Sequence, residues 1–445
     1  MAAKKSSKKG KEGAREAFKG TIEVAFDYNG GTRYNIESGH IVYIMIESNY
    51  LSDSVIPVVF MSINVNSKMY SMITESNKTS KFYLKIEKTN VMGNVPITKK
   101  VLEGAFSYVT SATSPNITDK LNSTNKGETD NSFRSINVGL VQTEMIDLMR
   151  KSFDEGVYRD TDQNTLLGLA LEGLPKVVIE TPQYNEPIKQ EIYKPSASRY
   201  RFIEQIFNMK SFYDTRYTFF MDFDRTYLLS QKGNAVDAGD GDCNSIIIEI
   251  GDVDDRETFY SGFKVENGAY RIRVNASDTN VVVNEGTEKV TNNIVAIDDE
   301  KSLQDLKLNM NNTAGSATKP MYVRSRDAAI LKNSMENDTV LVEIMKQNID
   351  STVFTPNKEI NVNHYGKYAK YNGRYLLNYK REFYKMSADQ FTVTCNVGLK
   401  KVNSNEVSGA ESDNYTTDNP AVSPSASISS SSNKAISYPS RKASR

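Results

Sequence analysis

The sequence predicts a mainly β protein with a few helices (α+β), with β-barrel domains and a helix-containing central region. Three observations lead to this prediction. Several segments alternate apolar and polar residues with the period of two that half-buried strands require. Asn-Gly pairs stand between such segments, where tight hairpin turns need residues with positive φ. Only a few stretches space their apolar residues as an amphipathic helix does.

Composition limits the chemistry that the chain can perform. Its 445 residues suggest roughly two to four domains. Lys and Arg together number 55, as do Asp and Glu, so no global field attracts nucleic acid or an anionic membrane. Two cysteines (Cys243, Cys395) and two histidines (His40, His364) are too few for a disulfide framework or for much imidazole chemistry. No segment reaches the about 18 consecutive apolar residues of a membrane helix, so we expect no membrane segment.

The N-terminal half begins with a predicted flexible basic arm, residues 1–19, which carries seven Lys or Arg against two Glu. Residues 20–110 are predicted to form an antiparallel barrel or sandwich. In "TIEVAFDY" the apolar residues alternate with polar ones, and Asn29-Gly30 then supplies a hairpin turn. Residues 111–137 are rich in Ser, Thr and Asn, which indicates a linker.

Residues 138–250 are predicted to mix helices and strands. "GLVQTEMIDLMRKSFDEG" and "SASRYRFIEQIFNMKS" have helical spacing, with Ser198 as N-cap of the second, and "KVVIE" is a short strand. Residues 251–401 are predicted to be β-rich, with hairpins around Asn267-Gly268 and Asn372-Gly373. Residues 402–445 are Ser-rich with little to bury, which indicates a disordered tail.

The stretch "YTFFMDFDRTYLL", residues 217–229, is nearly the nucleophile motif of haloacid-dehalogenase-like phosphohydrolases. There the first carboxylate attacks phosphorus, the second handles a proton, and both help to hold magnesium. Period-two counting instead places Asp222 and Asp224 on the polar side of a continuing, half-exposed strand. Arg225 stands where that motif normally has glycine. A polar strand face is the favoured interpretation, and a magnesium-dependent phosphohydrolase is the alternative.

Other candidate sites have simpler explanations. Asp252, Asp254 and Asp255 could hold magnesium in the phosphohydrolase alternative, but the α/β alternation that would place them is missing. "DAGDGDCNSIIIEIGD" matches a calcium loop only at its first, third and fifth positions (Asp240, Asp242, Asn244), and departs from it at the sixth and twelfth (Ser245, Gly251). A solvated acidic turn is the better interpretation.

The stretch "HYGKYAKYNGRYLLNYKREFYK" interleaves Tyr with Lys and Arg, which could stack nucleic-acid bases, but a hairpin with a Tyr/Lys solvent face explains it without any ligand and is favoured. His40 and His364 do not lie near a candidate nucleophile in the sequence. We therefore predict no catalytic, cofactor-binding or metal-binding residue, no cofactor and no enzymatic activity.

Two stretches resemble the hub proteins of bacteriophage tail baseplates and related tail-like injection machines. "HIVYIMIESNYLSDSVIPVVFMSINVNSKMYSMI" is similar to the strand-loop-Pro-strand succession of the first hub barrel. "RFIEQIFNMKSFYDTRYTFFMDFDRTYLLS" resembles the hub pattern of an amphipathic helix, an aromatic turn and a strand pair ending in Asp-x-Asp. The resemblance covers residues 20 to 230, with a weaker likeness to about residue 400, and the hub pattern does not require the tail after residue 402.

The resemblance implies a structural virion protein of the tail or baseplate, assembled in the host cytoplasm. It implies a homotrimer whose two tube-like barrel domains per subunit form a pseudo-sixfold ring, joining a hexameric tail tube to a threefold spike. Expected partners are the tail tube, the spike and other baseplate proteins, with a genome contact in the lumen. A β-rich receptor- or carbohydrate-binding tail protein is a further alternative.

Overall fold

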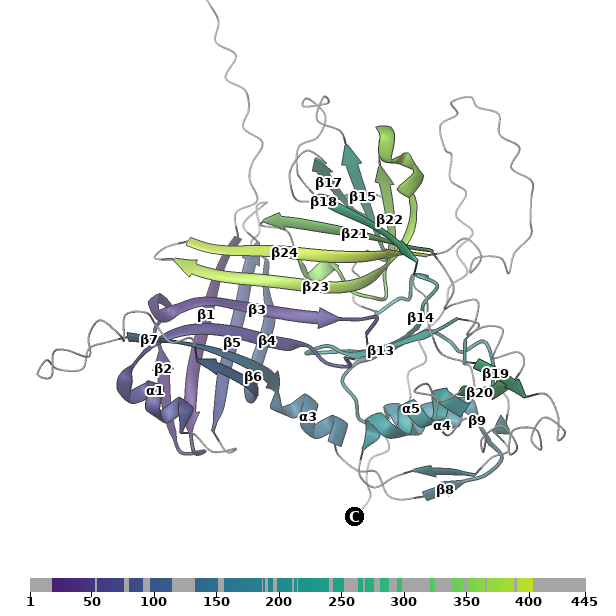
Figure 1. The fold of residues 1–445 in the computed structure, drawn as a ribbon, viewed down its shortest axis with the longest axis horizontal. Helices are drawn as coiled ribbons and strands as arrows, with labels where there is room; N and C mark the ends of the chain where they lie inside the picture. The colour runs from purple at the N-terminus through teal and green to yellow at the C-terminus, as the bar shows by residue number, and fades with distance from the viewer. Residues whose placement is uncertain are drawn as a thin grey trace, which may run out of the picture.

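The computed structural model confirms that the protein is mainly β with a few helices (Figure 1). In the described part of the chain, no helix is long and apolar enough to cross a membrane. The predicted basic arm and Ser-rich tail lie almost wholly outside the described residues. The structure describes residues 18–402 with gaps at 53, 76–79, 91–96, 114–132, 151–155, 186, 189–190, 195–197, 210–211, 214, 240–242, 252–262, 267–268, 276–280, 288–293, 298–320, 325–337, 348–350, 365 and 388–389.

The N-terminal part forms an antiparallel sheet with the spatial order β3-β4-β7-β6-β5-β1-β2. Alternate residues point into a first hydrophobic core, as the period-two pattern predicts, so Ile22, Val24 and Phe26 of β1 are all buried. After β1, Asn29 and Gly30 have φ of 50° and 75°, which confirms the predicted turn. The elements are β1 (Phe18–Tyr28), β2 (Thr32–Ile36), the 3-10 helix η1 (Ser38–His40), β3 (Ile41–Asn49), β4 (Val58–Asn66), α1 (Ser67–Thr74), β5 (Lys81–Asn90), β6 (Ile97–Thr113) and β7 (Phe133–Gln142).

Strand β7 differs from the predicted organisation. The sequence pattern assigns residues 111–137 to a linker, but β6 continues to Thr113 and β7 begins at Phe133, between β4 and β6. Its inward residues Ile136, Val138 and Leu140 are buried. These apolar residues stand one at a time among polar ones, so a half-buried strand was mistaken for the end of a polar linker.

The central part packs short elements around a second core. Helix α5 begins after Ser198, whose Oγ accepts a hydrogen bond from the Arg201 backbone N at 3.4 Å, which confirms the predicted N-cap. The strand predicted in "KVVIE" is β10, whereas helix α4 was not predicted. The elements are α3 (Thr143–Arg150), β8 (Gly156–Tyr158), β9 (Thr161–Asp162), α4 (Gln163–Leu171), β10 (Val177–Ile179), β11 (Pro187–Ile188), β12 (Ile192–Lys194), α5 (Arg199–Met209), β13 (Tyr217–Met221) and β14 (Thr226–Ser230).

The C-terminal part adds further strands around a third core. In it β15 pairs in parallel with both β17 and β22, while the other strands that pair with β17 and β22 are antiparallel to them. The elements are β15 (Ser245–Gly251), β16 (Phe263–Glu266), β17 (Ala269–Asn275), β18 (Val281–Thr287), β19 (Ile294–Ile297), β20 (Met321–Arg324), β21 (Asp338–Gln347), the 3-10 helices η2 (Ser351–Val353) and η3 (Gly366–Tyr371), β22 (Glu359–His364), β23 (Gly373–Ser387) and β24 (Gln390–Lys401).

The two predicted C-terminal hairpins have different outcomes. Glu266 lies opposite Ala269, so the hairpin predicted around residues 267–268 is confirmed. The hairpin around Asn372-Gly373 is wrong, because η3 stands before β23 and the partner strand is the more distant β22. The Asn372 side chain instead accepts a hydrogen bond from the backbone N of His364, at the end of β22.

Strand β23 joins the N-terminal and C-terminal strands into one sheet. It pairs with β22 and β24 on the C-terminal side, and its residues 379–384 pair with residues 44–49 of β3. In Figure 1 the yellow β23 and β24 lie beside the purple β3 and β4. The sheet also bends back on itself, because β24 contacts β1 and a Cβ on Gly20 would stand 2.5 Å from the Phe391 ring. A side chain at Gly20 would therefore block this approach.

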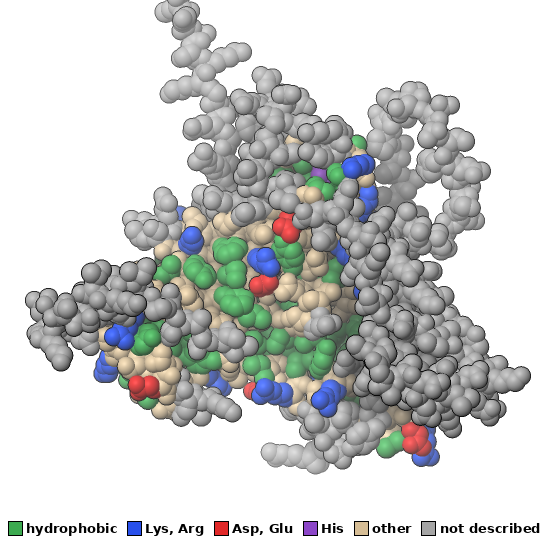
Figure 2. Space-filling view, in the orientation of Figure 1, with side chains coloured by type: hydrophobic (Ala, Val, Ile, Leu, Met, Phe, Trp, Pro, Cys, Tyr) green, Lys and Arg blue, Asp and Glu red, His purple; other side chains and the backbone are tan. Residues whose placement is uncertain are grey.

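The outward side of the joined sheet carries an apolar patch. Phe383 of β23, Met45 of β3 and Phe60 of β4 form one cross-strand row and are only half-buried. The Arg381–Glu47 ion pair lies in the next row, at 3.1 Å. Figure 2 shows hydrophobic side chains gathered over these strands. We define the outer apolar face as Tyr43, Met45, Val58, Phe60, Tyr379 and Phe383.

The packing of β23 on β24 leads to a first prediction. Gly398 lies opposite Tyr379, and a Cβ there would stand 2.2 Å from the tyrosine ring. We expect Gly398→Ala to lower the free energy of unfolding by about 1–3 kcal/mol, because the ring or the strand must move. The control is Gly31→Ala, where the nearest atom would be 4.0 Å away. Urea unfolding that gives both variants the same stability would contradict this packing.

Candidate functional site

The chain reverses direction at the Asp-x-Asp motif. Met221 of β13 lies opposite Thr226 of β14, and the Asp222 backbone N donates a hydrogen bond to the Arg225 carbonyl at 2.7 Å. The prediction of one strand that continues through Asp222 and Asp224 is therefore wrong. Aspartate side chains favour turns by bonding to nearby backbone, so this turn forms without glycine or proline.

The hairpin is also more buried than predicted. Residues 218–221 and 226–230 are buried throughout, so neither strand has a solvent face. Phe219 and Met221 pack in the second core, whereas Phe220 packs in the third core against Tyr50. Period-two counting assumes that one face meets water, and it fails here because a core lies on each side of the hairpin.

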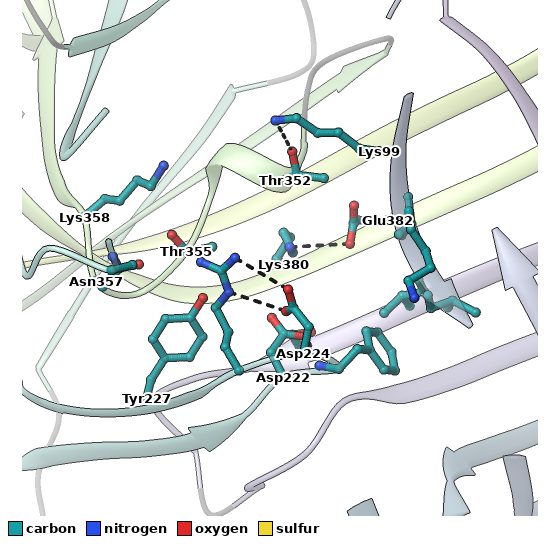
Figure 3. Close-up of a pocket in the computed structure, with 18 of the residues that line it drawn as sticks. Lys99, Asp222, Asp224, Tyr227, Thr352, Thr355, Asn357, Lys358, Lys380 and Glu382 are labelled. Carbon is teal, nitrogen blue, oxygen red and sulfur yellow. Dashed lines mark hydrogen bonds and ion pairs between the residues drawn. The ribbon is translucent and has the colours of Figure 1, made fainter. Parts of the chain in front are cut away.

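The turn from Asp222 to Arg225 forms one wall of a cavity of about 420 Å³ (Figure 3). The other walls come from β3, β6, β23, residues 237–238 and 243–244, and residues 352–358. The cavity thus lies where the N-terminal sheet, the central hairpin and the C-terminal strands meet. Its charged lining residues are Lys99, Lys100, Glu103, Asp222, Asp224, Arg225, Asp237, Lys358, Lys380 and Glu382.

A buried ion pair on β23 forms the floor of this region. Lys380 Nζ and Glu382 Oε2 are 3.5 Å apart, and their side chains are 8% and 4% exposed. Glu382 also accepts a hydrogen bond from the Tyr384 hydroxyl at 2.9 Å, while Lys380 donates to the Ser351 carbonyl at 3.5 Å. Burial would raise the pKa of Glu382, but Lys380 and Ser351 hold it below its usual value. Glu382 therefore stays ionised inside the protein.

Asp222 interacts electrostatically with the same charged group from the hairpin side. Its carboxylate accepts hydrogen bonds from the Phe223 backbone N at 2.9 Å and from the Tyr50 hydroxyl at 3.5 Å. Burial raises the pKa of Asp222, and the nearby positive charge of Lys380 opposes that rise. For Lys380, burial disfavours the charged form, but Glu382, Tyr50 and Asp222 raise its pKa well above the ordinary value. The hairpin turn and β23 are thus electrostatically linked.

The phosphohydrolase alternative is not favoured by this geometry. Asp222 follows a strand that pairs antiparallel to its neighbour, not a parallel strand whose carboxyl end could present a nucleophile. Among the described residues, no group of three or more His, Cys, Asp or Glu side chains could hold a metal ion. Asp252, Asp254 and Asp255 lie outside the described residues.

The remaining predicted positions are spread over the fold. Asp240 and Asp242 lie outside the described residues, whereas Asn244 precedes β15, which spans Ser245–Gly251. His364 ends β22 and meets Tyr371 edge-on, and His40 stacks on Phe133 in the N-terminal sheet. Cys243 lines the cavity, and Cys395 is buried in the third core.

The sequence did not reveal the buried charges. Lys380, Glu382 and Tyr384 alternate with Arg381 and Phe383, so both faces of β23 carry charged and aromatic residues. When neither side of a strand is apolar, the sequence pattern does not show which side faces the core. The one usable signal was "YKREFYK" itself, a strand-like stretch that has charged residues on both of its faces.

Comparisons with known proteins give structural similarities only. No protein-family model and no curated protein matches the chain. The chain is similar to the tail protein from Neisseria meningitidis MC58, with a TM-score of 0.42 and 10% identity over 85% of this chain and 96% of that one. It is also similar to a 43 kDa tail protein of prophage MuSo2 from Shewanella oneidensis, with a TM-score of 0.43 and 10% identity over the same shares.

A third similar structure is a component of the type VI secretion system of E. coli, with a TM-score of 0.35 and 7% identity over 82% of this chain and 74% of that one. These structural neighbours are phage tail proteins and a secretion-system tail protein, the class that the sequence resembles. At such low identities and TM-scores, the likeness carries no argument about what this chain does.

The raised pKa of Asp222 leads to a second prediction. A carboxyl group whose pKa is higher in the folded state favours folding when it is protonated. This contribution to stability is lost as pH rises above the group's pKa in the unfolded chain, about 4, and through its pKa in the folded state. We expect the free energy of unfolding of the wild type, relative to Asp222→Asn, to fall as pH rises from about 4 through the folded pKa. Urea unfolding across pH measures it. A relative stability that increases over that range would contradict the raised pKa.

Proposed function

We propose that this chain is a structural subunit of a phage tail or related tail-like injection machine, and that it acts as the baseplate hub between tail tube and spike. The resemblance of two sequence stretches to hub proteins motivates the proposal. The observation that carries it in the structure is the outer apolar face, which spans three neighbouring strands of the joined sheet.

An apolar sheet face open to water is unfavourable unless another surface covers it. Soluble monomers rarely expose broad apolar patches, and such patches mark interaction surfaces. The outer apolar face has the composition of an interface core, since Tyr, Phe and Met are enriched there. The Arg381–Glu47 pair within it satisfies its own charges, so covering it leaves no unpaired charge. This surface therefore suits a structural assembly.

In the proposed assembly the subunits form a homotrimer, and the tail tube, the spike and other baseplate proteins are the partners. The protein then resides in the virion tail after assembly in the host cytoplasm, with a contact to the genome in the lumen. We propose no enzymatic activity. The zero formal net charge agrees with a role based on interfaces, since it provides no long-range field to recruit a charged substrate.

The oligomeric state tests this proposal. We expect native mass spectrometry of the wild type at micromolar concentration to show a trimer, and Phe60→Glu to give folded monomers, because a carboxylate in the centre of an interface is costly to desolvate. The matched control is Val157→Glu on β8, where an exposed valine lies away from the outer apolar face and is 57% exposed. This control should remain trimeric.

Two outcomes would count against the proposal. A wild type that is strictly monomeric at that concentration would overturn the homotrimeric hub. A Phe60→Glu variant that stays trimeric with an unchanged melting temperature would show that the outer apolar face is not the subunit interface.

The absence of phosphohydrolase activity is tested separately. We expect p-nitrophenyl phosphate with magnesium to be hydrolysed at the buffer background rate by the wild type and by Asp222→Asn alike, because Asp222 is held in a closed turn by Phe223 and Tyr50. A wild-type rate above background that Asp222→Asn removes would restore the enzymatic alternative.

A further inference from the structure

The cavity beside the Asp222 turn contains polar side chains that the fold itself leaves unsatisfied. Thr355 and Asn357 are 8% and 2% exposed, and both line the cavity. Thr355 Oγ1 and Asn357 Oδ1 are buried and have no hydrogen-bond partner among the described residues. The Asn357 amide N is used, since it donates to the Val236 carbonyl at 2.9 Å. This bond fixes the amide orientation and leaves its oxygen as an acceptor.

A buried polar atom without a partner costs free energy, about 1–3 kcal/mol by the usual measure. Two such atoms at one cavity suggest that the cavity is built to receive hydrogen-bonding groups. Figure 3 shows Thr355, Asn357, Lys358 and Tyr227 on one side of the cavity, with Lys380 and Glu382 on the other. The volume of about 420 Å³ is within the range of small-molecule sites.

The cavity is lined by five acidic and five basic side chains, so the partners of these groups, and not the net charge, decide which ligand fits. Its carboxylates already have partners: Glu382 has Lys380, and Glu103 has Lys100 at 3.3 Å and the Tyr83 hydroxyl at 2.9 Å. Asp237 accepts a hydrogen bond from the backbone N of Gly239 at 2.8 Å. No group of three or more His, Cys, Asp or Glu that could hold a metal ion occurs in the part of the chain that the structure describes. A cationic ligand would have to displace these partners.

Arg225 is suited to recognise the anion. Its side chain is 20% exposed and lines the cavity, and a guanidinium matches the geometry of a carboxylate or phosphate. Its ion pair with Asp224 is long, at 3.4 Å, and the Asp224 side chain is 73% exposed. Only the Asp224 end of this pair is open to water, which screens the attraction there. An entering anion can therefore compete with Asp224 for Arg225, which also interacts electrostatically with Tyr227 on the cavity wall.

We propose that this cavity binds a small hydroxyl-bearing oxyanion. The phosphate or carboxylate group lies against Arg225 and the Thr355 hydroxyl. A hydroxyl group of the ligand donates to Asn357 Oδ1, the acceptor that the fold leaves open. This binding site does not depend on the hub role, because it lies within one chain and is formed without the outer apolar face.

Calorimetric titration of the full chain at constant ionic strength tests the proposal. The probes are ribose 5-phosphate, citrate and uncharged ribose. We expect ribose 5-phosphate or citrate to bind with a Kd of about 1 mM or tighter, and ribose not to bind. Binding of the first alone identifies phosphate as the recognised group, and binding of the second alone identifies carboxylate.

Matched threonine variants separate binding from folding. Thr355→Val removes only a hydroxyl that no described residue satisfies. The free energy of unfolding should therefore not fall, while the affinity for the anion falls about threefold to tenfold. Thr226→Val is the control: Thr226 Oγ1 is also buried without a described partner, but Thr226 does not line the cavity. It should bind as the wild type does. Arg225→Gln should weaken binding about tenfold or more.

Three results would overturn the site. In the first, neither anion binds with a Kd below about 10 mM. In the second, ribose binds as tightly as ribose 5-phosphate, so the anionic group plays no part. In the third, Thr226→Val weakens binding as much as Thr355→Val, so the effect is structural. A monomeric wild type that binds ribose 5-phosphate would support this site while contradicting the hub.

Discussion

The structure depends on keeping two opposite charges buried on β23. Lys380 and Glu382 lie on its inward side, where the strand also pairs with β3. Removing two charges from water costs several kcal/mol each, and this cost is offset only when the remaining hydrogen-bonding positions are filled. Tyr384 and Ser351 fill them. The position of η2, which carries Ser351, is thus tied to β23 through the hydrogen bond from Lys380.

The central hairpin is attached at the same place by directional bonds. The Met221 backbone N donates to the Val55 carbonyl at 2.7 Å, and the Tyr50 backbone N donates to the Asn378 carbonyl at 2.8 Å. Tyr50 then contacts both Asp222 and Phe220. The segment after β3 therefore holds the central hairpin on one side and β23 on the other. Because hydrogen bonds depend on both distance and direction, these bonds hold the three cores in one arrangement.

The sequence predicted what is local. Ile22, Val24 and Phe26 face the core because period-two alternation needs only one solvent face, and Ser198 caps α5 because capping involves only neighbouring residues. The turn at Asp222 was not predicted, because both aspartates were assigned to the polar face of a continuing strand. Aspartate also forms turns.

Long-range pairing escaped prediction altogether. The parallel contact of β15 with β17 and β22, and the contact of β23 with β3, join residues far apart in the chain. Nothing in the spacing of nearby residues specifies such neighbours. The cavity was missed for the same reason: Arg225, Thr355 and Lys380 come from separate segments, and only the fold brings them together.

Strand β23 carries charges and aromatic rings on both of its sides, which an isolated half-exposed sheet would avoid. Its inward side carries Lys380 and Glu382, while its outward side presents Tyr379 and Phe383. In a free monomer both choices are unfavourable, since charges are desolvated and aromatic rings stay wet. If another subunit covers the outward side, the rings contribute apolar burial and only the inward pair remains costly. That pair specifies one register of β23 against β3, because a slip by one residue would turn both charges outward. The buried pair thus sets the register of β23 within the chain, whereas the proposed subunit contact would cover the rings on its outward side.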